Sequence, residues 1–359
     1  MKRLFILTVI SCSLAFFISY LKKEEPTTIK SAENIDKEWF KRNTNPYISK
    51  KEIRTGYISF MSYPEWHLVY CPEEQASYFN HRTSSTFPFM EQTSQIWEGY
   101  EIMNNQVKES YKVDFTYHLM IWVIGISSSV EYSVKAWYET IVGRITDTHY
   151  VVTEEDKFNA KFTQSYVDFI KDRPWYEYNF KNQLKDLWTN TSFIGDHFFR
   201  KLERKYILTS ELLVKYVYGK LIGIGSQSIY GSSKETTPIV LEKRPRNFSK
   251  KNIDSLYKDK AVLIYLPRYD KFNNAAVDIV KKGGKFKEIG GNTSAILVTI
   301  IVPSKFEKKY PNTIEILTQP IPSNHNKKRI AIATLVPNLD ELINATVKDR
   351  VQIEHIYDY

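Results

Sequence analysis

The sequence predicts an α+β protein with an N-terminal transmembrane anchor, an aromatic-rich all-helical domain and a C-terminal ferredoxin-like α+β domain. An apolar run near the N-terminus predicts the anchor. Helical periodicity continues to about residue 230, and beyond about residue 259 strand-like segments alternate with two helices. The predicted boundaries are 1–25 for the membrane anchor or signal segment, 26–47 for a tether, 48–230 for the helical domain, 231–258 for a basic linker and 259–359 for the α+β domain.

The composition is that of a folded protein. The chain has 359 residues, enough for two domains that each bury a core, and 14% of them are aromatic, which argues against disorder. The net charge of +9 is spread along the chain without a long basic run, so we expect no nucleic-acid partner. The two cysteines, Cys12 and Cys71, cannot build a disulfide framework or a cysteine-based zinc site, and we expect no cofactor.

The apolar run Leu4–Leu21 is the predicted anchor. Its eighteen residues, at about 1.5 Å each, nearly cover the hydrocarbon core of a bilayer. Lys2 and Arg3 precede the run, and it is followed by Lys22, Lys23, Glu24 and Glu25. Because the two glutamates dilute the positive charge on that side, the charges favour a cytoplasmic amino terminus and an extracytoplasmic body. The alternatives are a cleaved signal peptide and a lipoprotein signal processed at Cys12, but no small-x-small cleavage pattern precedes the charged residues. We expect a single-pass membrane protein that contacts the membrane through residues 4–21, with a protein partner in the membrane or periplasm.

The first helix signal in the predicted helical domain is Ser62-x-x-Glu65. This spacing is that of a capping box, and Pro64 suits the first turn, so a short helix is expected to begin at Ser62 and present His67. Glu65, His67 and His81 are candidate metal ligands, and Glu65 and His67 are also candidate catalytic residues. Residues two apart point to nearly opposite sides of a helix. The alternative is therefore a structural cap beside partly buried aromatic residues.

A continuous helix is predicted from His118 to Ile145. Within it, Glu131 and Lys135 have the four-residue spacing of a helical ion pair. They are candidate acid/base residues if buried, and a surface ion pair if exposed. A related pattern returns 80 residues later at Glu211 and Lys215. It indicates either an internal duplication that sets two helices face to face or a chance match, since few positions are identical.

Two segments of the helical domain have membrane alternatives. The apolar half of His118–Ile145 could be a second membrane pass, but only about a dozen uncharged residues precede Glu131, which is typical of a core helix. The amphipathic segment Leu208–Ile229 could lie on a bilayer surface or pack in the core. Between them, Thr153 to Asp156 marks the start of another helix, which should end before Pro174.

The predicted C-terminal domain alternates strands and helices. Strands are expected at 261–266, 285–289, 295–302, 313–319, 329–336 and 351–357, and helices at 269–282 and 339–346. Ala295–Val302 is almost entirely apolar, which indicates a central, buried strand. His355 and Asp358, near the end, could lie in a ligand site at a sheet edge; the alternative is that His355 is an ordinary strand residue.

Four motifs carry a resemblance to a known family. They are YPEWHLVY at 63–70, EYSVKAWYETIVGRIT at 131–146, RPWYEYNF at 173–180 and EHIYDY at 354–359. In these motifs the chain resembles an uncharacterised family of bacterial membrane-anchored proteins, over nearly its whole length after the anchor. The resemblance implies the architecture and the location of the chain. It implies no catalytic or binding residue.

The sequence shows no phosphate-binding glycine loop, nucleophile elbow, zinc-protease motif or dinucleotide fingerprint. We therefore expect a membrane-anchored, extracytoplasmic interaction or sensing module without enzymatic activity. The alternative is an enzyme or small-ligand binder with a pocket between helices near Glu65, His67, Glu131 and Lys135.

Overall fold

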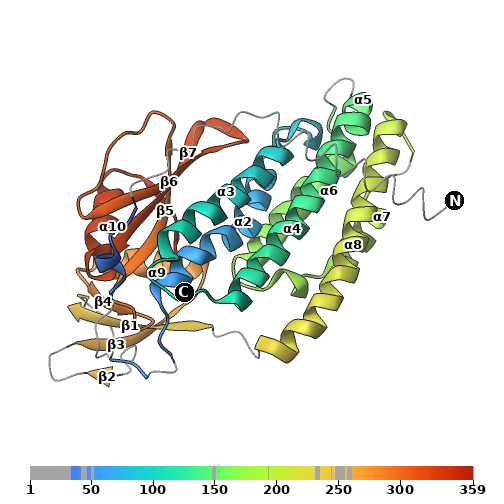
Figure 1. Cartoon of the computed structure of the whole chain (residues 1–359). Coiled ribbons are helices and arrows are strands. Elements are labelled where there is room, and N and C mark those ends of the chain that lie inside the picture. Colours follow the sequence, from blue (N-terminus) through green and yellow to red (C-terminus); the bar gives the residue numbers. More distant parts are fainter. Residues whose placement is uncertain are drawn as a thin grey trace.

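The computed structural model describes residues 34–41, 47–49, 52–147, 151–192, 194–230, 235–243, 245–246, 255–256 and 261–358. The predicted anchor, Leu4–Leu21, lies outside the described residues. Figure 1 shows a group of long helices on one side of the molecule and the strands, with two further helices, on the other. Among the described residues, none of the helices has the combined length and hydropathy of a membrane-spanning segment.

The helical part consists of long α-helices and of short helical segments of three to five residues. In chain order these are η1 (Lys37–Phe40), α2 (Gly56–Phe79), η2 (Ser84–Thr86), α3 (Phe89–Val107), α4 (Phe115–Tyr138), the π-helical turn η3 (Glu139–Gly143), α5 (Arg144–Thr146), α6 (Glu154–Ile170), η4 (Trp175–Glu177), α7 (Phe180–Asn190) and α8 (Phe198–Tyr230). Helix η1 lies in the stretch predicted as a tether, yet Ile35 and Phe40 are buried there.

Helix α2 runs through both of its prolines, Pro64 and Pro72. The predicted helix start at Ser62 is wrong, because the helix begins at Gly56 and the Ser62 hydroxyl donates to the Ile58 carbonyl inside it. A proline removes one backbone hydrogen bond from a helix interior. Helix α2 tolerates two of them because it is packed between α3, α6 and the strand β5 described below.

Two other predicted helices are confirmed. The segment His118–Ile145 is helical throughout, since α4 continues through the π-helical turn into α5. Helix α6 starts where Thr153 predicts, and the side chains of Thr153 and Asp156 form a capping box. Local signals were sufficient here because caps and apolar periodicity agree.

The C-terminal part contains two antiparallel sheets of four strands each. The strands are β1 (Thr236–Lys243), β2 (Ser255–Leu256), β3 (Val262–Pro267), β4 (Lys285–Ile289), β5 (Ala295–Pro303), β6 (Thr313–Ile321), β7 (Asn324–Leu335) and β8 (Gln352–Ile356), with helices α9 (Asp270–Lys281) and α10 (Leu339–Lys348) and the turn η6 (Val336–Asn338). The strand orders are β2-β3-β1-β4 and β6-β7-β5-β8.

The α+β class is therefore confirmed, but the strands do not form the predicted single ferredoxin-like sheet. Strand β1 lies within the segment predicted as a basic linker, and it pairs with both β3 and β4. Because β1 lies between them, β3 and β4 belong to a first sheet that is separate from the sheet of β5 to β8. Strand β5 holds the same position in the second sheet, between β7 and β8, as its apolar sequence predicts.

The helical and C-terminal parts share one core around the second sheet. Successive side chains of a strand point to opposite faces. On β5, Ile296 and Val298 face a cluster with α9 and α10, while Ala295 and Leu297 face a cluster with α2 and α3. The Tyr63 hydroxyl of α2 donates to the Gln319 side chain of β6 at 2.6 Å. The sheet is thus covered by helices on both faces, and α2 holds the two parts together.

Candidate functional site

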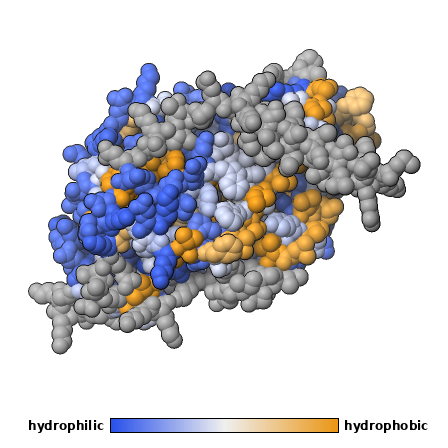
Figure 2. Space-filling view, in the orientation of Figure 1, coloured by the Kyte–Doolittle hydropathy of each residue, from blue (hydrophilic) through white to orange (hydrophobic). Residues whose placement is uncertain are grey.

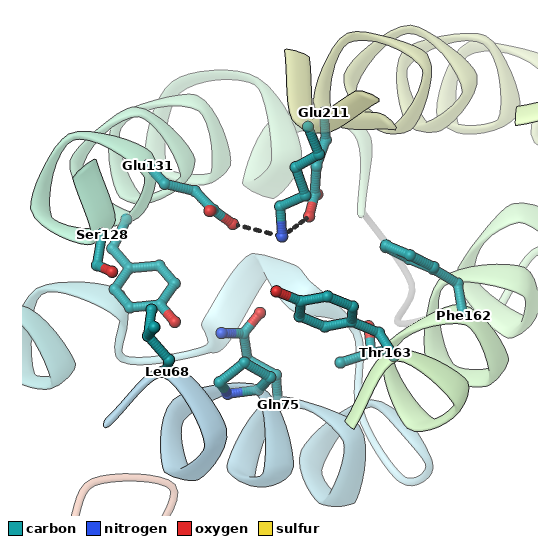
Figure 3. Close-up of a pocket in the computed structure, with 11 residues that line it drawn as sticks. Leu68, Gln75, Ser128, Glu131, Phe162, Thr163 and Glu211 are labelled. Atoms are coloured by element: carbon teal, nitrogen blue, oxygen red, sulfur yellow. Dashed lines mark ion pairs between the residues drawn. The ribbon is translucent and has the colours of Figure 1, made fainter. Parts of the chain in front are cut away.

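A half-buried ring of four charges joins α4 and α8. Lys135 contacts Glu131 and Glu211, both at 2.8 Å, and Lys215 contacts the same two carboxylates at 3.1 Å. Positive and negative groups alternate around the ring, so the four charges cancel. Figure 3 shows the carboxylates of Glu131 and Glu211 pointing toward each other from the two helices, with Gln75 of α2 on the opposite side of the cavity.

The ring shows that α4 and α8 run in opposite directions. Glu131 pairs across to Lys215, and Lys135 pairs across to Glu211. Residues 80 positions apart therefore occupy equivalent places on the two helices. The related patterns noted in the sequence do meet face to face, which is the arrangement expected of an internal duplication.

The ring borders a cavity of about 30 Å³. This volume has room for one or two water molecules. The remaining walls come from α2, α4 and α6, and are formed by Leu68, Pro72, Gln75, Ser128, Tyr132, Phe162, Thr163 and Tyr166. The ring of Tyr166 lies 4.9 Å from the Lys215 ammonium, which adds a cation–π contact to the two ion pairs.

The electrostatics of the ring favour the charged forms of Glu131, Glu211 and Lys215. Burial alone would raise the pKa of Glu131, but Lys135 and Lys215 together lower it to about 2. The same two lysines outweigh burial at Glu211 and lower its pKa as well. Burial would lower the pKa of Lys215, and the two carboxylates raise it instead. General acid/base catalysis at neutral pH needs a pKa near 7. The lowered pKa values of Glu131 and Glu211 therefore do not suit general acid/base catalysis at neutral pH.

A second buried ion network lies further along the same two helices. The Arg204 guanidinium donates to Glu139 and Glu203, both at 2.6 Å. Arg200 contacts Glu203 and Asp156 of α6, both at 2.8 Å. The exposed fractions of Arg200 and Arg204 are only 3% and 1%. The sequence did not single out these arginines, because a basic helix face is usually solvated.

The π-helical turn η3 aims Glu139 into this network. Such turns interrupt α-helices and often occur at functional sites. A side-chain carbon at Gly143 would lie 2.0 Å from the end of the Glu139 side chain, so a larger residue there would displace the carboxylate from its present position. The turn and the glycine together let the carboxylate fold back against Arg204.

The outer faces of α4 and α8 are apolar. Trp137 of α4 is 59% exposed and Phe199 of α8 is 77% exposed. We use "the α4–α8 face" for the exposed large apolar residues of these helices, which are Phe115, Leu119, Trp122, Val123, Ile126, Val130, Val134, Trp137, Ile141, Phe198, Phe199, Leu202, Tyr206, Leu213, Val214, Val217 and Leu221. Figure 2 shows apolar residues gathered over α4 and α8. The pattern is inverted relative to an ordinary surface helix, whose charged residues face water.

The other candidate residues do not join the ring. Glu65 accepts a hydrogen bond from the Tyr117 hydroxyl at 3.2 Å, and burial raises its pKa. His67 is buried, its Nδ1 lies 3.8 Å from the Cys71 sulfur, and burial lowers its pKa. His81 is exposed just beyond the end of α2. None of the three lines the cavity. Within the described ranges, no group of three or more His, Cys, Asp or Glu side chains could hold a metal ion.

His355 lies in β8 and Asp358 follows it, and both side chains are buried. The imidazole of His355 in β8 packs on Trp66, with ring centres 3.5 Å apart, and burial lowers its pKa. Asp358 accepts a hydrogen bond from the Thr237 hydroxyl at 2.9 Å, and burial raises its pKa to about 6. Both side chains are thus buried, His355 against Trp66 of α2 and Asp358 against Thr237 of β1.

Comparison with known proteins gives no match: no family model, no curated protein and no solved structure is significantly similar to this chain. The geometry of α4 and α8 is therefore the basis for the function proposed below.

Proposed function

We propose that this protein is a membrane-anchored, extracytoplasmic interaction or sensing module that binds its partners without transforming them. The observation that carries the proposal is the inverted arrangement of α4 and α8, in which charges are paired inside and large apolar side chains are exposed. An exposed apolar patch of this size is rare on a soluble monomer and usually marks a site of contact with protein or membrane.

The buried charges support binding over catalysis. The ring of Glu131, Lys135, Glu211 and Lys215 is neutral as a whole, and each carboxylate contacts two ammonium groups. Charges that are fully paired in this way stabilise one arrangement of the helices. They leave the exposed apolar face as the part of the helical domain that is free to meet a partner.

A second function is favoured by one observation, the cavity beside Glu131 and Lys135. An enzyme or small-ligand binder with a pocket near Glu65, His67, Glu131 and Lys135 would use it. Its volume of about 30 Å³ suits water, whereas pockets for small molecules are commonly about 300 to 1,000 Å³. This function therefore requires α2, α4 and α8 to separate when the ligand binds.

The sequence supports the membrane location. The run Leu4–Leu21 has the length of an anchor, and the four motifs resemble those of the uncharacterised bacterial membrane-anchored family. The charges beside the run favour a body on the extracytoplasmic side.

Fractionation of cells that express the full chain tests the proposal. The chain should stay in the membrane pellet after a high-salt wash, and protease added to spheroplasts should digest residues 34–358. A matched variant without residues 1–25 controls for pelleting by aggregation. Release of the full chain by salt, or complete protection of its C-terminal half from protease, would contradict the proposed location.

A further inference from the structure

The exposed side of α4 carries no charge over most of its length. Between Asp114 and Arg144, its exposed residues are Phe115, Thr116, Leu119, Trp122, Val123, Ile126, Val130, Val134, Trp137, Thr140 and Ile141. This stretch is about 40 Å long at 1.5 Å per residue. On α8, the exposed residues from Phe198 to Val217 are likewise uncharged. A helix surface of this length that faces water normally carries some charged residues.

The charges of the same helices between Glu131 and Tyr138 of α4 and between Phe198 and Val217 of α8 are not exposed. Arg200 and Arg204 are among the most deeply buried residues of the chain, and both have carboxylate partners. Ionisable residues placed in a lipid environment face the protein interior and pair with one another. The two ion networks below the α4–α8 face have this property.

The apolar positions repeat between the helices at the same offset as the ring. Exposed apolar residues 80 positions apart form the pairs Leu119 and Phe199, Trp122 and Leu202, Ile126 and Tyr206, Val134 and Val214, Trp137 and Val217, and Ile141 and Leu221. The ring relates such positions by a local twofold axis, because α4 and α8 are antiparallel. The two members of a pair therefore lie in opposite directions from the ring, and the row on α4 runs antiparallel to the row on α8. They form one broad apolar surface with a local twofold arrangement, suited to a flat partner.

The first described residues lie beside the end of α3, which precedes α4 in the chain. The Ile35 amide donates to the Gln106 side chain at 2.9 Å, and Lys37 pairs with Glu109 at 3.0 Å, so these residues lie beside the end of α3. Only thirteen residues separate Ile35 from the apolar run Leu4–Leu21. Thirteen residues reach at most about 45 Å. If the run is in the membrane, the end of α3, which leads into α4, is within reach of the same membrane.

We propose that the α4–α8 face is embedded in the outer part of a lipid bilayer, with both helices parallel to the membrane plane. This inference rests on the proposed membrane anchor. It adds that the folded body contacts the bilayer directly and is not connected to it by the anchor alone. An apolar helix face in this position is buried about 5–10 Å into the boundary between headgroups and acyl chains. Lys220, the first exposed charge along α8, has a stem long enough to place its ammonium at the headgroups.

Nitroxide labels on the full chain test this inference. Val130→Cys on α4 and Val214→Cys on α8 place labels on the face, and Lys281→Cys on α9 is the matched exposed control. All are made with Cys12→Ser, while the buried Cys71 is kept. The proteins are reconstituted in phosphatidylcholine–phosphatidylglycerol vesicles and floated on a density gradient. Collisions of each label with oxygen, which enters the acyl region, are compared with collisions with a water-soluble nickel complex.

The expected result is that oxygen dominates at residues 130 and 214 and the nickel complex dominates at residue 281. Nickel dominance at all three positions in floated vesicles would overturn the inference while leaving the anchor intact. Exclusion of both probes from the face, with spin–spin broadening between labels, would also overturn it, since a second copy of the chain would then cover the face. Failure of the full chain to float would instead overturn the proposed function. Circular dichroism checks that each variant is folded, and either label alone is sufficient for the decision.

Discussion

Removal of one carboxylate from the α4–α8 ring should destabilise the protein through the positive charge left behind. We consider Glu131→Gln and Glu211→Gln, which keep the shape and the hydrogen-bonding oxygen. In each variant, Lys135 and Lys215 share the single remaining carboxylate. The ring then carries one net positive charge in a largely buried site.

The size of the effect follows from exposure. Breaking a fully buried ion pair costs about 3–5 kcal/mol, and an exposed pair is worth about 0–1 kcal/mol. The Glu211 side chain is 11% exposed and the Glu131 side chain is 33% exposed. We therefore expect a loss of about 3 kcal/mol for Glu211→Gln and about 2 kcal/mol for Glu131→Gln.

A double variant separates the stranded charge from other effects. Glu131→Gln combined with Lys215→Gln leaves Lys135 and Glu211 as a neutral pair. The loss of unfolding free energy in the double variant should be smaller than the sum of the losses for Glu131→Gln alone and Lys215→Gln alone, by more than about 1 kcal/mol. The free energy of unfolding is measured by urea titration of the full chain in detergent for five proteins: wild type, Glu131→Gln, Glu211→Gln, Lys215→Gln and the double variant. A loss below about 1 kcal/mol for Glu211→Gln, or additive losses in the double variant, would show that solvent screens the ring.

Three further predictions concern pH and packing. The lowered pKa of Glu131, about 2, gives stability that is present above its ordinary value near 4.5 and is lost as the pH falls toward 2, so Glu131→Gln should approach wild type over that window in acid denaturation. A difference in stability between Glu131→Gln and wild type that stays the same from pH 4.5 to pH 2 would contradict this. The pKa of Asp358, raised to about 6, has the opposite sign: the folded state favours the protonated form, and stability is lost as the pH rises from about 3.8 through 6. Asp358→Asn should therefore be more stable than wild type at pH 7.5 by about 1–3 kcal/mol and similar to it near pH 3.5, whereas a deficit at both values would refute the burial argument. Gly99→Ala would place a carbon 2.6 Å from the buried ring of Tyr63 and should cost about 1–3 kcal/mol in thermal unfolding, while Gly219→Ala, with its nearest contact at 3.5 Å, should be neutral or stabilising. Equal effects of the two substitutions would contradict the packing.

The sequence predicts elements well where local signals agree. The helix through His118–Ile145 and the helix start at Thr153 follow from periodicity and capping, and both are present. Strand β1 was missed because Pro238 and the basic residues after it resemble a linker, although a short apolar run separates them. Its pairing partners lie far along the chain, and no local signal identifies them.

The sequence does not predict which side of α4 and α8 faces the core. Helical periodicity separates polar from apolar residues but is the same whichever side is buried. The charges of Arg200 and Arg204 became interior groups only because Glu139 and Asp156 approach from other segments. The one signal in the sequence was the recurrence of Glu131 and Lys135 at an offset of 80 residues, and the structure gives it a meaning as a ring.

Fluorescence of Trp137 tests the placement of α4 and α8 in lipid without any added label. Trp137 is an exposed residue of the α4–α8 face, near the C-terminal end of α4. Lipids brominated along their acyl chains should quench the reconstituted full chain, and Trp137→Phe should lose a clear part of that quenching. If bromolipids quench the Trp137→Phe variant to the same extent as wild type, the α4–α8 face does not contact lipid and the proposed seating of the body on the membrane is wrong.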